Sequence, residues 1–399
     1  MKRKVISYVT VMALLVGTFP INAFAAENTL SDYDKMIVNI VENSDENSGV
    51  YFKDNILHIV PTEGKGDTLS TTLYNTRNSG VEYIIDNPAK YTADELQTAF
   101  LTLRANRDDL DITSYTVNFE NNGIIVSAAD WTEEEKEEIA NLLGIENIEF
   151  ISEGNDVKFD EYDELANETA EVDNLSDNSF NTMSNNATYK AKLGYRMNWE
   201  ANSDINYTIG RAVEDSRGNI YFVTAGHGLA TDDEMYLETV TDSDSGTYIN
   251  GLMGTVEEAL AEGDIDAALV ASNDAFLPTT ITRENVYVED DGTPYEGSIS
   301  TVWTCRGPVF VKITSTGVDV MWEGNWMENM IEMSYGSTTT TGGGDSGACI
   351  SILWNNDYTQ QRYIGIYKGR KELADGSMRI YGTNRTVIED RYNVSSYQE

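Results

Sequence analysis

The chain has 399 residues, of which 67 are acidic and 27 basic, so its formal net charge is −40 at pH 7. This length predicts two or three domains, each large enough to bury its own core. The negative charge disfavours nucleic acids and anionic membrane surfaces as partners, because both carry charge of the same sign. Two cysteines are too few for a disulfide scaffold or a cysteine-rich zinc site, and the only histidines are His58 and His227. We therefore predict no metal ligands and no cofactor.

The first 25 residues predict an export signal. Positions 2–4 are basic, positions 5–21 are largely apolar, and Ala-Phe-Ala at 23–25 is typical of a cleavage site. The alternative is a transmembrane anchor, which is disfavoured because the apolar run is short and ends at Pro20. We expect residues 1–25 to be removed and the mature protein to be secreted, with no membrane attachment, into a compartment that permits disulfides.

Residues 26–155 predict a small α+β unit. Capping-box patterns at 92–95 and 132–135 each predict the start of a helix. An Asn-Asn-Gly turn at 121–123, flanked by alternating apolar residues, predicts a β-hairpin between the two helices. The segment 145–151 predicts a further strand. Nothing in this unit resembles a nucleophile, a ligand cluster or a phosphate-binding loop.

Residues 156–186 are polar, acidic and without periodicity, and they predict a solvated linker. The stretch 27–186 carries 35 acidic and 9 basic residues, so the negative charge is concentrated in the first half of the chain. His58 lies within an apolar run of this half, and we expect its role to be structural.

Residues 187–399 predict an all-β domain. Short apolar runs recur between turn signals, which is typical of a sandwich or of barrels. The clearest helical pattern lies near the end, around 386–392.

The strongest chemical motif is Gly-Gly-Gly-Asp-Ser-Gly at 342–347. A serine hydroxyl attacks a carbonyl only when a base removes its proton and N–H groups stabilise the resulting oxyanion. Flanking glycines allow the tight turn that such a site needs. An ordinary glycine-rich loop is the alternative. Ser346 is therefore a candidate nucleophile.

Two further residues complete a candidate triad. His227, in Thr-Ala-Gly-His-Gly after an apolar run, is a candidate general base. Asp266 heads the apolar run 267–270 and could orient that histidine, with Asp264 as the competing carboxylate. Each residue alone has a plainer reading, a structural histidine or a turn aspartate. The order His227, Asp266, Ser346 is one of the known triad orders.

At these residues the second half resembles the chymotrypsin-like serine peptidases, and within them the bacterial branch of alpha-lytic protease and the streptogrisins. The matching motifs are Thr-Ala-Gly-His at 224–227, Asp-Ala-Ala-Leu-Val at 266–270 and Gly-Asp-Ser-Gly at 344–347. The resemblance covers roughly residues 187–399. It implies two antiparallel six-stranded β-barrels with an active cleft between them, acting on protein or peptide substrates.

The resemblance also implies a role for each residue. Ser346 attacks the peptide carbonyl, His227 acts as base and then as acid, and Asp266 orients His227. The backbone N–H groups of Gly344 and Ser346 form the oxyanion hole.

Residues 112–153 are similar to the end of the pro-region of alpha-lytic protease, which acts as a folding catalyst and inhibitor. We therefore expect residues 26–155 to be an α+β pro-region that is the enzyme's intramolecular chaperone and inhibitor. We place the maturation cut between about 164 and 190, most plausibly near 185–188, and expect a monomer.

The chain departs from the family pattern at its cysteines. The family usually has a cysteine after the histidine, where this chain has Gly228. Cys305 and Cys349 lie in predicted strands of the second barrel, and the resemblance leads us to expect a disulfide between them. Such a loop closure would contribute about 4 kcal/mol in the chain-entropy model. Two buried free thiols are the alternative.

The resemblance places the substrate pocket at five residues. Thr340 lies near its floor, and its wall and mouth are formed by Thr341, Lys368, Gly369 and Arg370. No acidic residue stands at the floor position, which disfavours a preference for Lys or Arg. Lys368 replaces the family's usual small residue. One hypothesis is that Lys368 or Arg370 attracts an acidic side chain, and the other is that both are surface cations.

Two other functional classes remain open. One is a catalytically inactive peptidase homologue that acts as an extracellular binding protein. The other is a secreted esterase, which is disfavoured because the chain lacks a Gly-x-Ser-x-Gly elbow and the βα alternation of that fold.

Overall fold

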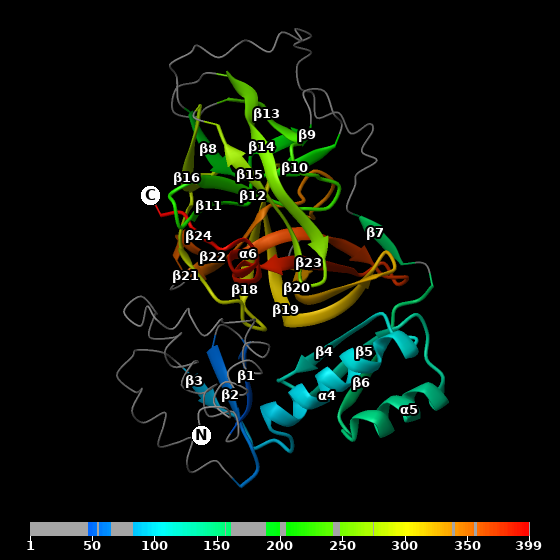
Figure 1. Ribbon diagram of the computed structural model, residues 1–399. Helices are drawn as coiled ribbons and strands as arrows, with labels where there is room; N and C mark the ends of the chain where they lie inside the picture. The colour runs from blue at the N-terminus through cyan, green and yellow to red at the C-terminus, as the bar shows by residue number, and fades with distance from the viewer. Residues whose placement is uncertain are drawn as a thin grey trace.

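The computed structural model describes residues 47–53, 56–64, 83–155, 157–160, 189–199, 205–241, 248–273, 275–336, 340–354 and 357–398. The predicted signal and maturation cut, and most of the predicted linker, lie outside the described residues. The described chain forms an N-terminal unit (residues 47–160) and a two-barrel unit (residues 189–398), as Figure 1 shows. No helix among the described residues is long and apolar enough to cross a membrane.

The N-terminal unit has the predicted order of helix, hairpin, helix and strand. Its first helix is capped by Thr92, whose side chain accepts from the Glu95 N–H while Glu95 accepts from the Thr92 N–H. Thr132 and Glu135 cap the second helix in the same way, and it ends at Gly144 in the left-handed conformation. The elements are β1 (Asn47–Lys53), β2 (Ile56–Pro61), β3 (Tyr83–Ile85), α4 (Ala93–Asn106), η2 (Arg107–Asp109), β4 (Ser114–Asn118), β5 (Gly123–Ala128), α5 (Glu133–Leu143), β6 (Ile148–Ser152) and β7 (Lys158–Asp160).

This unit has its own apolar core. Leu96, Phe100 and Leu103 recur at helical spacing on α4 and pack against the buried face of the β4–β5 hairpin. His58 lies at the edge of that core, where its Nδ1 is 3.0 Å from Asp86 Oδ1 and its ring stacks on Tyr51. These contacts fit the structural role expected of His58.

The first barrel closes because one of its strands bends. β10 pairs with β9, whereas β11 pairs with β12, and only Ile209 and Gly210 separate β10 from β11. The ladder therefore returns on itself in the order β9, β13, β14, β15, β12, β11–β10, all of them described strands. The strands are β9 (Arg196–Trp199), β10 (Asn206–Thr208), β11 (Arg211–Asp215), β12 (Ile220–Thr224), β13 (Glu234–Thr241), β14 (Tyr248–Glu262) and β15 (Ile265–Ser272).

The second barrel closes through pairing between its first and last strands in the ring. Its described strands form a ring of antiparallel pairs in the order β18, β19, β20, β23, β22, β21 and back to β18. They are β18 (Ile299–Thr304), β19 (Gly307–Trp322), β20 (Asn325–Tyr335), β21 (Cys349–Trp354), β22 (Asp357–Glu372) and β23 (Met378–Asn384). The predicted fold class, two antiparallel six-stranded barrels after an α+β unit, is therefore confirmed.

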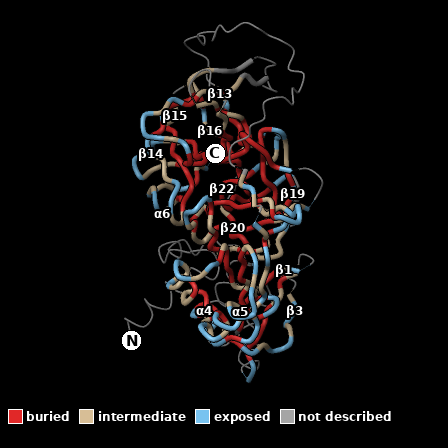
Figure 2. Tube along the Cα trace, turned by 90° about the vertical axis from the view of Figure 1, so that its right-hand side faces the viewer, coloured by how far each residue is buried: buried red, intermediate tan, exposed pale blue. Residues whose placement is uncertain are grey.

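The remaining described elements connect or flank the barrels. The helix α6 follows the second barrel and starts one residue before the predicted helical pattern. Figure 2 shows the buried parts of the trace concentrated in the barrels, with exposed segments around α4 and α5. These elements are β8 (Tyr189–Leu193), β16 (Phe276–Thr282), β17 (Tyr287–Asp291), α6 (Arg385–Tyr392) and β24 (Val394–Ser396).

The N-terminal unit extends the sheet of the second barrel in two places. β4 pairs with β19 through Tyr115 opposite Asp319, and β7 pairs with residues 370–372 of β22. β7 lies inside the range predicted as linker, so the start of that range is a strand rather than a solvated coil. It forms because β22 offers an unpaired strand edge that a short extended segment can join.

Candidate active site

The histidine loop follows β12 and is held against β15. Val223 of β12 pairs with Leu269, and Thr224 pairs with Ala268, so the end of β12 lies beside the start of β15. Gly226 allows this approach because a Cβ there would lie 2.1 Å from Leu260 O and 2.5 Å from Ala267 O. The register therefore brings His227 next to Asp266.

Asp266 binds His227 through both of its carboxylate oxygens. Oδ1 accepts from the backbone N–H groups of Gly226 (2.8 Å) and His227 (2.9 Å), and Oδ2 is 2.7 Å from His227 Nδ1. Asp266 is 0% exposed. Burial alone would raise the pKa of this carboxyl, but the neighbouring His227 and Lys368 outweigh burial and hold it well below its usual range. Asp266 is therefore an ionised group that fixes the orientation of the imidazole.

The competing carboxylate lies elsewhere. Asp264 accepts from Arg391 Nη2 at 2.7 Å near the surface, in a partly exposed ion pair. Asp264 precedes β15, which begins at Ile265, so it is not part of the strand that carries Asp266. Asp266, rather than Asp264, is the carboxylate that the structure brings to His227.

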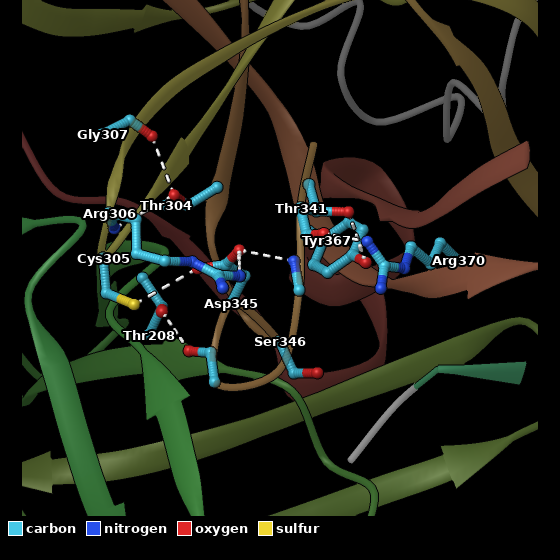
Figure 3. Close-up of polar contacts among 12 residues, drawn as sticks. Thr208, Thr304, Cys305, Arg306, Gly307, Thr341, Asp345, Ser346, Tyr367 and Arg370 are labelled. Carbon is cyan, nitrogen blue, oxygen red and sulfur yellow. Dashed lines mark hydrogen bonds and ion pairs between the residues drawn. The ribbon is translucent and has the colours of Figure 1, made fainter. Parts of the chain in front are cut away.

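The serine loop is built around the buried side chain of Asp345. Its Oδ2 accepts from the Gly342 N–H at 2.8 Å and from Arg306 Nη2 at 2.6 Å (Figure 3). Gly344 has φ +80°, a conformation that glycine adopts without strain. These contacts fix the turn that carries Gly344 and Ser346, the two residues that flank Asp345 in the sequence.

Adjacent residues of β10 hold the two loops together. Tyr207 donates its hydroxyl to His227 O at 2.8 Å, and the Thr208 N–H donates to Ser346 O at 2.8 Å. Thr208 Oγ1 also donates to Gly344 O at 2.6 Å. Both His227 and Ser346 are buried. β10 therefore binds the backbones of the His227 and Ser346 loops, and Asp266 binds the imidazole of His227.

Three of the five predicted pocket residues lie together, whereas Thr340 is exposed and the Lys368 side chain lies against Asp266. Thr341 is buried between two phenols, with Oγ1 2.6 Å from Tyr335 Oη and 2.9 Å from Tyr367 Oη. Arg370, half-buried, donates to Thr341 O, and the two lie side by side near Ser346 in Figure 3. Gly369 lies in β22 opposite Tyr381, and Thr340 is exposed. Thr341, Gly369 and Arg370 thus lie near one another, at the side of Ser346 that is formed by the second barrel.

Lys368 does not lie in a pocket wall. Its Nζ is 2.9 Å from Asp266 Oδ2 and 4.8 Å from the centre of the Trp322 ring. The hypothesis that Lys368 attracts an acidic substrate side chain is therefore wrong, because its ammonium group is buried against the triad aspartate. Sequence reasoning missed this contact. The signal for it was a lysine directly after the buried run 363–367, since a buried ammonium requires a buried carboxylate.

The predicted disulfide is also wrong. Both cysteines lie among the described residues, and both are free thiols. Cys305 donates to Asp345 Oδ1 at 3.2 Å and accepts from Arg196 Nη2 at 3.2 Å, whereas Cys349 is buried in the apolar core. The sulfur of Cys305 faces the serine loop because this polar cluster holds it there.

Burial raises the pKa of both thiols, to about 11 for Cys305 and about 12 for Cys349. Asp345 is the second cause for Cys305. Both groups are therefore protonated at neutral pH, and a protonated thiol is a poor nucleophile. Among the described residues, no group of three or more His, Cys, Asp or Glu side chains could hold a metal ion.

The chain matches no protein-family model and no curated protein. Solved structures with similarity include Thermobifida fusca Protease A, at 17% identity and TM-score 0.41, covering 53% of this chain and 100% of that one. Nocardiopsis protease matches at 18% identity and TM-score 0.41, over 52% and 100% of the two chains. Alpha-lytic protease homolog N4 matches at 15% identity and TM-score 0.39, over 52% and 98%. These likenesses are distant, and the fold is defined by the two closed barrels themselves.

Proposed function

We propose that the chain is a secreted serine endopeptidase, made as an inactive precursor, that hydrolyses peptide bonds in proteins. The observation that carries the proposal is the buried His227–Asp266 pair, held beside the Ser346 loop by consecutive residues of β10. A structural histidine does not require a fully buried carboxylate with both oxygens directed at it. A general base that becomes an imidazolium during the reaction does require such a carboxylate, which stabilises its positive charge.

The proposed reaction uses these residues in the roles that the family resemblance implies. Ser346 Oγ attacks the peptide carbonyl while His227 takes its proton, and the N–H groups of Gly344 and Ser346 stabilise the oxyanion. The C–N bond then breaks as His227 gives the proton to the leaving amine, which leaves an acyl ester on Ser346. Water, deprotonated by His227, attacks the ester and releases the acid, and the proton returns to Ser346. Asp266 remains ionised throughout.

The N-terminal unit acts as pro-region in this proposal. β7 occupies the edge of β22 at residues 370–372, which include the predicted pocket residue Arg370 and directly follow Gly369. Glu153 and Lys371 form a fully buried ion pair at 2.5 Å between the two units. A strand bound there would obstruct an extended substrate beside Gly369, which supports an inhibitory role. The pairing of β4 with β19 would supply a template during folding.

The first test is a fluorophosphonate probe applied to the secreted, matured protein. Labelling at Ser346 and casein hydrolysis, both lost in Ser346→Ala, are expected. The matched control is Ser395→Ala, which changes a serine on β24 and should keep full activity. A folded wild-type protein that is secreted and matured but neither labels nor cleaves casein would overturn the proposal. That result would favour the inactive binding homologue.

A further inference from the structure

Lys368 contacts two members of the triad through different atoms. Its ammonium group is 2.9 Å from Asp266 Oδ2, the same oxygen that binds His227 Nδ1 at 2.7 Å. Its backbone carbonyl accepts the hydroxyl of Ser346 at 3.1 Å. Lys368 is 3% exposed. The residue is therefore part of the site, although the proton transfers of the triad do not use it.

The surroundings of the ammonium group are closed. Trp322, at the end of β19, places its ring 4.8 Å from Nζ and is itself buried. A cation held over an indole face and against a carboxylate is stabilised without water. Because the site excludes solvent, charges within it act on one another with little screening.

The titratable groups packed around the pair come from several elements. β15 provides Asp266, the loop after β12 provides His227, and β22 provides Lys368. Two phenols also reach this region: Tyr207 of β10 donates to His227 O, and Tyr392 of α6 donates to Ala267 O. Burial is the largest cause that raises the pKa of Tyr392, so that phenol is uncharged at neutral and acid pH. The charge balance at the site is therefore set by the lysine, the aspartate and the histidine.

We propose that Lys368 is a positioning residue that shifts the working pH range of the peptidase downward by opposing the protonation of His227. The inference rests on the proposed function and deepens it. With Lys368 present, the charges of the lysine and the aspartate sum to zero, and protonating the histidine gives the site a net charge of +1. With a neutral residue at position 368, the site carries the aspartate charge of −1, and the same protonation brings its net charge to zero. The histidine therefore accepts a proton less readily beside the lysine, and activity persists to lower pH.

The test is the pH dependence of kcat/KM for the matured Lys368→Met variant, made from the full-length chain. Methionine retains much of the volume of the lysine stem without its charge. We expect the acid limb of the profile to move up by about one to two pH units, the size that a unit charge at this range in a partly screened protein site produces. Lys368→Arg keeps the charge and is expected to leave the limb within about 0.3 unit of wild type.

Lys312→Met is the matched control, because it removes the same charge from an exposed position on β19. Its acid limb should coincide with that of wild type, since exposed charges are screened by solvent and salt. A Lys368→Met acid limb that coincides with wild type would overturn the proposal, even if the rate falls. A merely structural lysine would change the rate or the stability without moving the limb.

Two other variants test the proposal even if Lys368→Met does not mature. The acid limb of Lys368→Gln should lie about one to two pH units above that of Lys368→Arg, because only the arginine keeps the charge. Coincident limbs would contradict the role of Lys368. Absence of Ser346 labelling in wild type would instead contradict the proposed function, so the two failures are distinguishable.

Discussion

Replacing Arg104 by alanine should weaken the binding of the N-terminal unit, the proposed pro-region, to the two-barrel unit. Arg104, on α4, donates Nε to Asp319 Oδ2 at 2.7 Å and Nη2 to Asp319 Oδ1 at 2.5 Å. Asp319 lies in β19 of the second barrel and is fully buried. It also accepts from the Tyr115 hydroxyl at 2.5 Å and from the Asn329 N–H at 3.0 Å. The substitution changes only the pro-region and leaves the mature enzyme as it is.

The size of the effect depends on the partners that Asp319 retains in the Arg104→Ala variant. Removing one partner of a buried ion pair costs about 3–5 kcal/mol, because the other charge is left uncompensated. Arg107 Nη1 remains 3.5 Å from Oδ2 and supplies part of the compensation. We therefore expect a loss near the lower end, about 3 kcal/mol, which corresponds to about a 150-fold weaker complex.

The assay is inhibition of the mature enzyme by the separately produced pro-region, which has an apolar core of its own. The inhibition constant should rise about 150-fold for Arg104→Ala. Lys136→Ala is the control, because Lys136 binds the exposed Glu133 on α5 and should alter inhibition less than about threefold. An Arg104→Ala pro-region that inhibits within about threefold of wild type, while keeping its fold by circular dichroism, would refute the reasoning.

Four further predictions concern the catalytic and regulatory groups. Asp266→Asn should lower kcat by about 10⁴-fold in a peptide assay because the histidine loses its orientation, whereas Asp264→Ala should stay within about threefold of wild type; equal losses would contradict the assignment. Burial, and then the charge of Glu120, raise the pKa of Glu296 to about 8. The protonated form of Glu296 therefore favours the complex with the proposed pro-region. This contribution is complete below about pH 4.5 and is lost as pH rises through 8. Inhibition should weaken over that interval, and Glu296→Gln should flatten the dependence. Alkylation of the denatured, unreduced protein should modify both cysteines, and one disulfide by mass would contradict the free thiols. A peptide library should show acidic residues before the scissile bond if Arg370 attracts them, and Arg370→Ala should abolish that preference; cleavage after apolar residues alone would exclude the hypothesis.

Local signals in the sequence were sufficient for the helices and turns. The capping boxes at Thr92 and Thr132 bind the backbone groups of their own first turns, so no distant contact is needed to predict them. The prediction of the triad had a different basis, namely the order of the three motifs and the resemblance to a known family. The structure brings Asp266 to His227, and the role of Ser346 stays a prediction.

Contacts between distant segments could not be predicted in the same way. The closure of the first barrel depends on a bend at Ile209 and Gly210, and two residues carry no periodicity. β7 has only three residues and is defined by the edge of β22, a partner that is distant in the sequence. The cysteine pairing was inferred from family resemblance, but the Asp345 cluster directs the sulfur of Cys305 elsewhere.

The segment Lys-Gly-Arg-Lys at 368–371 shows why these contacts matter for function. By resemblance, Lys368, Gly369 and Arg370 were expected at the wall and mouth of a substrate pocket, with surface cations as the alternative. In the structure Lys368 binds the Asp266 carboxylate, Arg370 binds the Thr341 carbonyl, and Lys371 binds Glu153 of the N-terminal unit. One short segment of β22 thus contacts the proposed triad, the predicted pocket and the proposed inhibitor. Removal of the N-terminal unit, as the proposed maturation requires, would leave the Lys371 ammonium without Glu153. Because a buried ammonium without a carboxylate is costly, we expect the end of β22 to rearrange or hydrate in that step. Lys368 keeps Asp266 within the same domain, so the triad is insulated from that change.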